Sequence, residues 1–184
     1  GCGTGNQTFR LAERFRAITA VEIDSDFVSI FQAKLETQSL GNVTFSDQPI
    51  EHSNIGVHDR AAAFFHVLNY IDSDGLADFL KGVAKHTKPG AAFVADVWHA
   101  EAALKHPPLP RTQTKRIGSS TFEIEIRPSL NTKNLTVRLD YKIAHNSSGN
   151  LEQFKEQLNL QLWPRAALIE QFDAAGFENV EFCE

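Results

Sequence analysis

The chain follows two different hydrophobic patterns, and the change between them constrains the fold more than any other feature of the sequence. Up to about residue 97, short runs that are apolar on both faces alternate with stretches of helical periodicity. From about residue 111 to 162, apolar and polar residues alternate one by one instead. We therefore expect a parallel α/β core that is interrupted by an antiparallel sheet.

The first pattern predicts a doubly wound α/β core with a mostly parallel sheet, because strands buried on both faces need helices on both sides. Helices are expected after Thr8, after Ser25 and from about Asp72, the last of them stopped by the run 88–90, which is Lys-Pro-Gly. The expected strands between and after them are 17–21, 43–45, 61–65 and 91–97.

The second pattern predicts three long one-sided strands, centred on 122–126, 135–143 and 154–162, in an antiparallel meander. The segment 104–116, rich in proline and basic residues, is expected to be a loop. The chain then returns to a helix from Pro164 to Gly176 and a last strand at 177–182. We divide it into an α/β core (1–97), a meander insertion (98–162) and a return to the core (163–184).

Composition excludes several classes of protein. The longest apolar runs are far shorter than the ~18–20 residues that cross a membrane. The formal net charge is −5 and the basic residues are scattered, which opposes bulk capture of nucleic acid. Cys2 and Cys183 lie at opposite ends of the sequence, with no zinc-type spacing. We therefore expect a cytoplasmic protein without a structural metal or a membrane partner.

The chemistry-bearing motif is the glycine loop Gly-Cys-Gly-Thr-Gly at 1–5, which is followed by a helix. Glu22 ends the second expected element about 17 residues after Gly5, where nucleotide-binding folds place a carboxylate for ribose hydroxyls. The dinucleotide fingerprint would need a small residue at the position of Asn6, and here the glycine falls one place earlier. This argues against a nicotinamide or flavin dinucleotide.

Together with Asp47, the segment 65–71 (Phe-His-Val-Leu-Asn-Tyr-Ile), the run 88–90 and the Ala-Gly-Phe at 175–177, these motifs resemble the successive landmarks of class I S-adenosylmethionine-dependent methyltransferases. The resemblance covers most of the chain outside 98–162. It implies that the glycine loop wraps the methionine part of the cofactor, Glu22 holds the ribose, and Asp47 with Gln48 contacts the adenine. The implied cofactor-binding set is Gly1, Cys2, Gly3, Gly5, Glu22, Ile23, Asp47, Gln48 and Phe65.

Methyl transfer requires an acceptor held in line and, where the acceptor carries a proton, a group that removes it. Doubly wound folds place their crevice at the carboxyl ends of the strands. His66 and Tyr70 are therefore the catalytic candidates, each with the alternative of a packing role. The candidates for contact with the acceptor are Asn69, Asp96, Trp98 and His99.

The family order also places a strand before the glycine loop and two strands after the last helix, of which only 177–182 is in the sequence. Without a central strand, buried backbone groups of both neighbours would lack partners. We expect the intact protein to extend at both ends, with a strand that ends in an acidic residue before Gly1. The meander is expected to cover the acceptor site or to form a homodimer contact.

The leading hypothesis is thus an S-adenosylmethionine-dependent enzyme that methylates oxygen or nitrogen of a small polar acceptor and releases S-adenosylhomocysteine. The alternatives are a nicotinamide-dependent oxidoreductase and a non-catalytic subunit that binds an adenosyl cofactor. For Glu22, the alternative to ribose binding is that it caps the helix that begins near Ser25.

Overall fold

The computed structural model describes residues 1–183, which form two compact units. The first unit contains 1–68, 73–97 and the residues from Ile169 onward, and the second contains 69–72 and 98–168. Each unit is described by itself.

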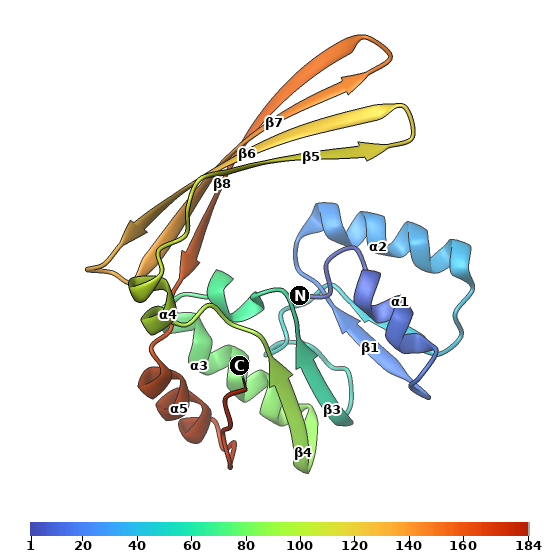
Figure 1. Ribbon diagram of the computed structural model, residues 1–184. Coiled ribbons are helices and arrows are strands. Elements are labelled where there is room, and N and C mark those ends of the chain that lie inside the picture. The colour runs from blue at the N-terminus through green and yellow to red at the C-terminus, as the bar shows by residue number, and fades with distance from the viewer. Residues whose placement is uncertain (184) are drawn as a thin grey trace. The chain divides into compact units, whose positions relative to one another are not determined.

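The first unit alternates helices and parallel strands, as the sequence predicts (Figure 1). Its strands form two parallel pairs, β1 with β2 and β3 with β4. In chain order its elements are α1 (Asn6–Ala12), β1 (Ile18–Val21), α2 (Ser25–Gln38), β2 (Val43–Ser46), β3 (His58–Ala63), α3 (Ser73–Lys85) and β4 (Thr87–Ala95).

The N-terminal residues lie between the two pairs of strands. Cys2 N–H donates to the carbonyl of Val21 at the end of β1, at 2.9 Å. Gly1 packs against Val67, just after β3. Among the described residues β1 and β3 are not paired with each other, so each has one edge without a neighbouring strand. A strand before Gly1 stays a prediction.

An aromatic stack joins α1 and α2 to the first pair of strands. Phe31 of α2 is fully buried, and the centroid of its ring lies 5.1 Å from that of Phe9 of α1 and 4.7 Å from that of Phe45 of β2. Around it lie the buried side chains of Ala20 and Val43. The helical spacing of the apolar residues thus builds the core that fixes the end of β1.

The second pair of strands departs from the expected bounds. β3 ends at Ala63, so Phe64 and Phe65 lie beyond it, and β4 begins at Thr87 rather than at 91. The run 88–90 therefore lies inside β4, where the pairing register shifts and Gly90 takes a φ of 74°. Val94 is 55% exposed, so this pair is not buried on both faces as expected.

The expected strand at 177–182 is absent from the described residues. α5 (Arg165–Ala174) ends as expected near Gly176, whose φ is 87°. The ring centroid of Phe177 then lies 5.7 Å from that of Phe93 and 5.4 Å from that of Phe172. Asn179 has a φ of 57°, which interrupts the extended backbone that a strand needs. Phe177 thus anchors a coil.

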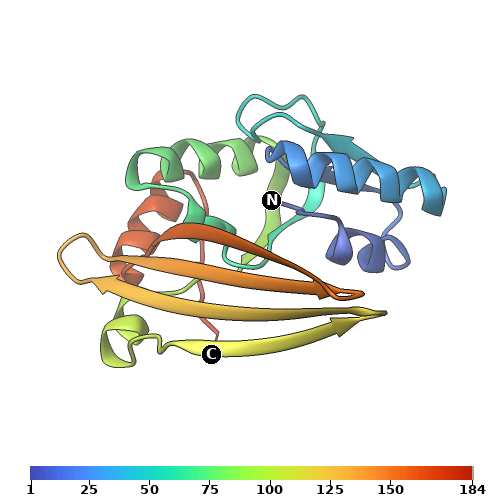
Figure 2. The same ribbon diagram turned by 90° about the horizontal axis from the view of Figure 1, so that it is seen from above.

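The second unit is a four-stranded antiparallel sheet in sequential order, shown side by side in Figure 2. Its elements are α4 (Ala100–Lys105), β5 (Arg111–Ile117), β6 (Ser120–Asn131), β7 (Thr136–Ser147) and β8 (Asn150–Gln161). The meander of β6, β7 and β8 is confirmed. The prediction of a loop up to 116 is wrong from Arg111, because β5 is an edge strand of mostly exposed polar residues and leaves no hydrophobic pattern.

Candidate functional site

At Gly5 the backbone of the glycine loop has a conformation that only glycine adopts without strain. Gly5 has a φ of 85° and precedes α1 as its N-cap residue. A Cβ there would lie 2.5 Å from the Phe9 ring and 2.7 Å from the Phe31 ring. Both the left-handed backbone and the aromatic stack therefore exclude a side chain. Lys34 of α2 supports the loop by donating to the Thr4 carbonyl at 3.0 Å.

Glu22 fastens this loop to the end of β1. One carboxylate oxygen, Oε2, accepts from Gly3 N–H at 2.7 Å. The other, Oε1, accepts from the N–H groups of Ile23 and Asp24 at 2.9 and 3.1 Å. The side chain is buried at 7% exposure. Because each carboxylate oxygen offers about two acceptor positions, Oε2 retains one for a further donor.

The alternative in which Glu22 caps α2 is wrong. The N-cap residue of α2 is Asp24, whose Oδ1 accepts from Asp26 and Phe27 N–H at 3.0 and 3.1 Å. The two neighbouring acids therefore have separate roles, since Asp24 caps α2 and Glu22 holds the glycine loop.

The surroundings of Cys2 disfavour its thiolate form. Burial raises the pKa of its thiol to about 11, and the nearby Glu22 carboxylate acts in the same direction. The reactive thiolate is consequently a minor species. Cys2 contributes its backbone to the loop, and its place in the cofactor-binding set stays a prediction.

The segment after β2 presents Asp47 and Gln48 to solvent. A hydroxyl that the sequence gave no reason to select holds this turn in place. Ser53 is buried, and its Oγ donates to the Gln48 carbonyl at 3.0 Å while lying 3.0 Å from Ser46 Oγ. The sequence alone does not reveal this role of Ser53, because its contacts depend on how residues 46–53 turn back on themselves.

A strained turn follows β3. Phe65 and His66 have φ values of 64° and 61°, which are unusual for two successive residues other than glycine. His66 N–H donates to Asp96 Oδ1 at 3.0 Å, and His66 Nδ1 lies 3.8 Å from Asp96 Oδ2. Asp96 N–H in turn donates to the Ala63 carbonyl at 3.3 Å. One aspartate after β4 therefore fixes the turn after β3.

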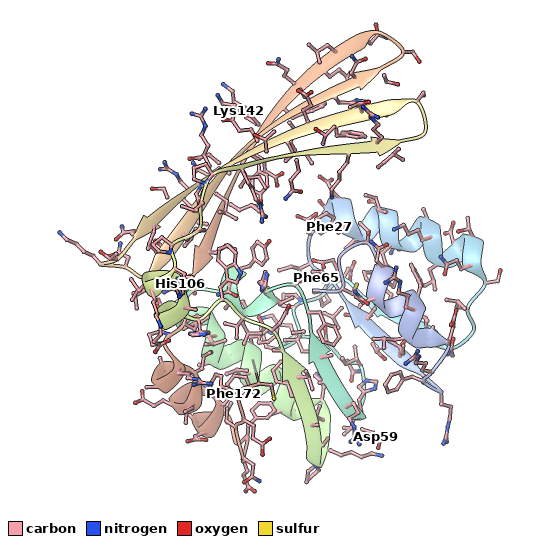
Figure 3. All side chains as sticks on the ribbon, viewed as in Figure 1. Phe27, Asp59, Phe65, His106, Lys142 and Phe172 are labelled. Carbon is pink, nitrogen blue, oxygen red and sulfur yellow. The ribbon has the colours of Figure 1, made fainter. Side chains whose placement is uncertain are left out.

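The turn exposes an aromatic ring. Phe65 is 65% exposed and Ile23, next to Glu22, is 67% exposed. Figure 3 places Phe65 beyond the end of β3 and Phe27 at the start of α2. An open hollow of about 230 Å³ is lined by Gln7, Phe64, Phe65 and Asp96. The ends of β1, β3 and β4 thus gather apolar surface, a carboxylate with spare acceptor capacity and a histidine in one unit.

The remaining sequence candidates belong to the second unit. Asn69 is fully buried; its Nδ2 donates to the carbonyls of Trp98 and Gln161 at 3.0 and 2.6 Å. Its Oδ1 accepts from Trp98 N–H at 2.9 Å. Its burial and these bonds to backbone favour a structural role, and contact with an acceptor stays a prediction.

Two further acceptor candidates have structural roles in this unit. Trp98 packs, partly buried, against the core of the sheet. His99 caps α4, because its Nδ1 accepts from Ala102 N–H at 3.3 Å. Tyr70 differs from both, since it is 57% exposed.

Within residues 1–183 we find no group of three or more metal-ligating side chains and no helix long and apolar enough to cross a membrane.

Comparison with known proteins finds similarity to methyltransferases. Residues 1–90 match a family model described as a methyltransferase domain. A protein of Geobacillus sp. (strain WCH70) with a provisional methyltransferase name is 32% identical over 71 residues, which are 39% of this chain and 29% of that protein. The chain therefore matches less than a third of the length of this curated relative.

Solved structures share the fold over nearly the whole chain. An S-adenosylmethionine-dependent methyltransferase from Clostridium acetobutylicum has a TM-score of 0.77 at 22% identity, covering 95% of this chain and 69% of its own. The sugar N-methyltransferase KedS8 from Streptoalloteichus sp. has 0.81 at 19%, covering 95% and 68%. The amino pentose methyltransferase CalS10 from Micromonospora echinaspora, bound to S-adenosylmethionine, has 0.80 at 18%, covering 96% and 72%.

The chain has the Rossmann-like fold of S-adenosylmethionine-dependent methyltransferases of known structure, and residues 1–90, just under half of the chain, match the methyltransferase domain model.

Proposed function

We propose that this chain transfers a methyl group from S-adenosylmethionine to nitrogen or oxygen of a small polar acceptor. The observation that supports this most is the Glu22 carboxylate, which holds the glycine loop through Gly3 and keeps one acceptor position on Oε2. A ribose hydroxyl can donate to that position.

The residues around Glu22 fit the rest of such a cofactor. Gly1, Cys2, Gly3 and Gly5 would receive the methionine part, because a loop of small residues lets a ligand approach the backbone closely. The exposed apolar side chains of Ile23 and Phe65 offer flat surface to an adenosyl group. Asp47 and Gln48, held by Ser53, would contact the adenine.

S-adenosylmethionine supplies an electrophilic methyl group when bound, so the chain has to orient the acceptor and take up its proton. His66 is the proposed base, since an imidazole changes protonation near neutral pH. Asp96 accepts a hydrogen bond from the backbone N–H of His66, which holds the turn, and its Oδ2 lies 3.8 Å from the ring Nδ1, close enough to stabilise a protonated ring. Tyr70 is the other catalytic candidate, and His99 stays a candidate for contact with the acceptor.

Amines are the favoured acceptors. The sugar N-methyltransferase and the amino pentose methyltransferase share the fold at TM-scores of 0.81 and 0.80. We propose that the meander unit serves the acceptor. A homodimer contact through the same unit stays a prediction, and no observation favours the nicotinamide alternative.

Isothermal titration with S-adenosylhomocysteine tests the cofactor half of the proposal, and binding is expected. A radiolabelled methyl-transfer screen over sugars, amines and phenols then tests the acceptor half. A folded sample that binds no S-adenosylhomocysteine would refute the proposed function. Stabilisation by NADH in a thermal-shift panel, without stabilisation by S-adenosylhomocysteine, would favour the oxidoreductase instead.

A further inference from the structure

The antiparallel sheet of the second unit carries three polar side chains on one face, at the end where β5 turns into β6 and β7 turns into β8 (Figure 1). His145 of β7 lies directly opposite Phe122 of β6 and opposite Glu152 of β8. Ser120 precedes Phe122 by two residues, so its side chain lies on the same face. The pairing register thus gathers a hydroxyl, an imidazole and a carboxylate within this unit.

The three side chains contact one another in a linear order. Ser120 Oγ lies 3.1 Å from His145 Nε2, and His145 Nδ1 lies 3.2 Å from Glu152 Oε2. Because an ionised carboxylate can only accept hydrogen bonds, it favours the neutral tautomer of His145 that has its proton on Nδ1. In that tautomer Nε2 is the acceptor for the Ser120 hydroxyl.

The neighbouring strands hold the imidazole in this orientation. The Phe122 ring stacks on the His145 ring, with an interplanar angle of 6° and centroids 4.4 Å apart. The His145 side chain is 22% exposed, so solvent reaches it only in part. Stacking therefore fixes the plane of the ring, while Glu152 and Ser120 engage its two nitrogens.

A hydroxyl, an imidazole and a carboxylate in this order are the parts of an activated serine nucleophile. The imidazole takes up the proton of the hydroxyl as the oxygen attacks, and the carboxylate orients the imidazole and stabilises its protonated form. Both contacts lie within the range of about 2.6–3.2 Å over which such groups cooperate. The same arrangement occurs on unrelated folds, so it is recognised by its geometry rather than by its place in the sequence.

We propose that Ser120, His145 and Glu152 form a nucleophilic triad in which Ser120 takes an acyl group from small activated esters. Ser120 Oγ forms a bond to the acyl carbon, and the bond from that carbon to the leaving oxygen breaks, so the leaving group departs with its electron pair. The hydroxyl proton moves to His145 Nε2 and from there to water. Ser120 and His145 are the catalytic residues, and Glu152 is a positioning residue.

The surroundings of the triad determine which donors fit. Ile117, the cross-strand partner of Ser120, is 67% exposed, and the Glu152 side chain is 62% exposed. An open site gives little assistance to a poor leaving group, so activated esters with a short acyl chain are the expected donors and amides are not. The reaction uses residues of the second unit alone and is independent of methyl transfer.

Treatment of the full chain with p-nitrophenyl acetate tests the proposal. Release of p-nitrophenol gives the rate, and peptide mass spectrometry after acid quenching locates the acetyl group. We expect acetylation of Ser120, which Ser120→Ala should abolish. His145→Gln should slow acetylation at Ser120 by about 100-fold or more, because a positioned general base contributes about 10²–10⁴-fold.

Ser119→Ala is the matched control, because Ser119 is the neighbouring serine and is exposed in the turn between β5 and β6. It should leave acetylation of Ser120 unchanged. Circular dichroism of each variant, compared with the wild-type protein, separates a loss of reactivity from a loss of the fold.

The pH dependence of the rate tests the role of Glu152. The charged residues in the row of His145 are Glu152 and, beyond Phe122, Lys115 of β5. Acetylation of Ser120 should speed up with rising pH as the imidazole loses its proton, because only the neutral ring can act as the base. Glu152→Gln should slow the reaction and move the midpoint of this rise to lower pH, since no carboxylate then stabilises the protonated ring. A merely structural role for Glu152 would leave the midpoint in place.

Three outcomes would overturn the inference. The first is a wild-type protein that is acetylated at lysine or cysteine but not at Ser120, a result that needs no variant. The others are equal acetylation of Ser119 and Ser120, and an unchanged rate at Ser120 in a folded His145→Gln sample.

Discussion

Replacing Glu22 with alanine should weaken both the fold and cofactor binding, and the structure gives the size of each effect. The substitution removes the acceptor of three backbone N–H groups. Ile23 is 67% exposed, so water can satisfy the N–H groups of Ile23 and Asp24. The loss that remains is the 2.7 Å bond from Gly3, and a hydrogen bond to a charged group contributes about 1.5–3 kcal/mol.

We therefore expect Glu22→Ala to lower the free energy of unfolding by about 2 kcal/mol, measured by urea denaturation. This differs from the interpretation that sequence alone favours, in which Glu22 faces only the ribose and stability hardly changes. If ribose hydroxyls also donate to the carboxylate, affinity for S-adenosylhomocysteine should fall about 10–100-fold, at about 1.4 kcal/mol per factor of ten.

Glu22→Gln separates the two roles. Its amide oxygen can still accept from Ile23 and Asp24, while its amide hydrogens face Gly3 N–H, so the loop bond is lost with little change of volume. Glu36→Gln, an exposed change on α2, is the control. Unchanged stability of Glu22→Ala would contradict the loop contact, and lower stability with unchanged affinity would show that the ribose assignment is wrong.

Three other outcomes follow from the first unit, and the first of them is compared with a glycine of the second unit. In urea melts, Gly5→Ala should lower the free energy of unfolding by about 2–4 kcal/mol, because it combines strain at positive φ with overpacking. Gly118 has a φ of 58° but open space around it, so Gly118→Ala should lower the free energy of unfolding by only about 1–2 kcal/mol. Asp96→Ala should reduce kcat more than Asp96→Asn, which keeps an oxygen for the strained turn, and equal rates would argue against that contact. At pH 8, mass spectrometry should find iodoacetamide labelling of Cys2 slower by about 100-fold than labelling of exposed Cys183, and rising about tenfold per pH unit toward pH 11 as thiolate forms.

The parts of the fold that the sequence predicts well are those whose environment leaves a strict pattern. β6, β7 and β8 are covered on one face only, so apolar residues recur at every second position and fix both type and register. The parallel strands leave a weaker signal. A run of alanines and phenylalanines indicates a strand without showing where the strand ends. The prediction for β3 is accordingly two residues too long at this end, since the strand stops at Ala63.

Elements without an apolar face could not be predicted in the same way. β5 is stabilised by backbone pairing with β6, from Arg111 opposite Ile126 to Ile117 opposite Ser120, while its side chains stay mostly in solvent. The coil at 177–182 is the opposite case. Its phenylalanines satisfy a strand pattern, but a cluster with Phe93 and Phe172 partly buries Phe177 without any strand partner.

For the candidate site, position along the sequence selects residues whose roles only the contacts can separate. Ends of parallel strands leave backbone groups unpaired, so a polar side chain there can serve either the backbone or a ligand. Asn69 is fully buried and donates both of its amide hydrogens to the carbonyls of Trp98 and Gln161, which favours a structural role. Glu22 serves the backbone too, but a carboxylate has more acceptor positions than the three N–H groups fill. The remaining capacity, rather than the position alone, is the reason that the ribose assignment is kept for Glu22.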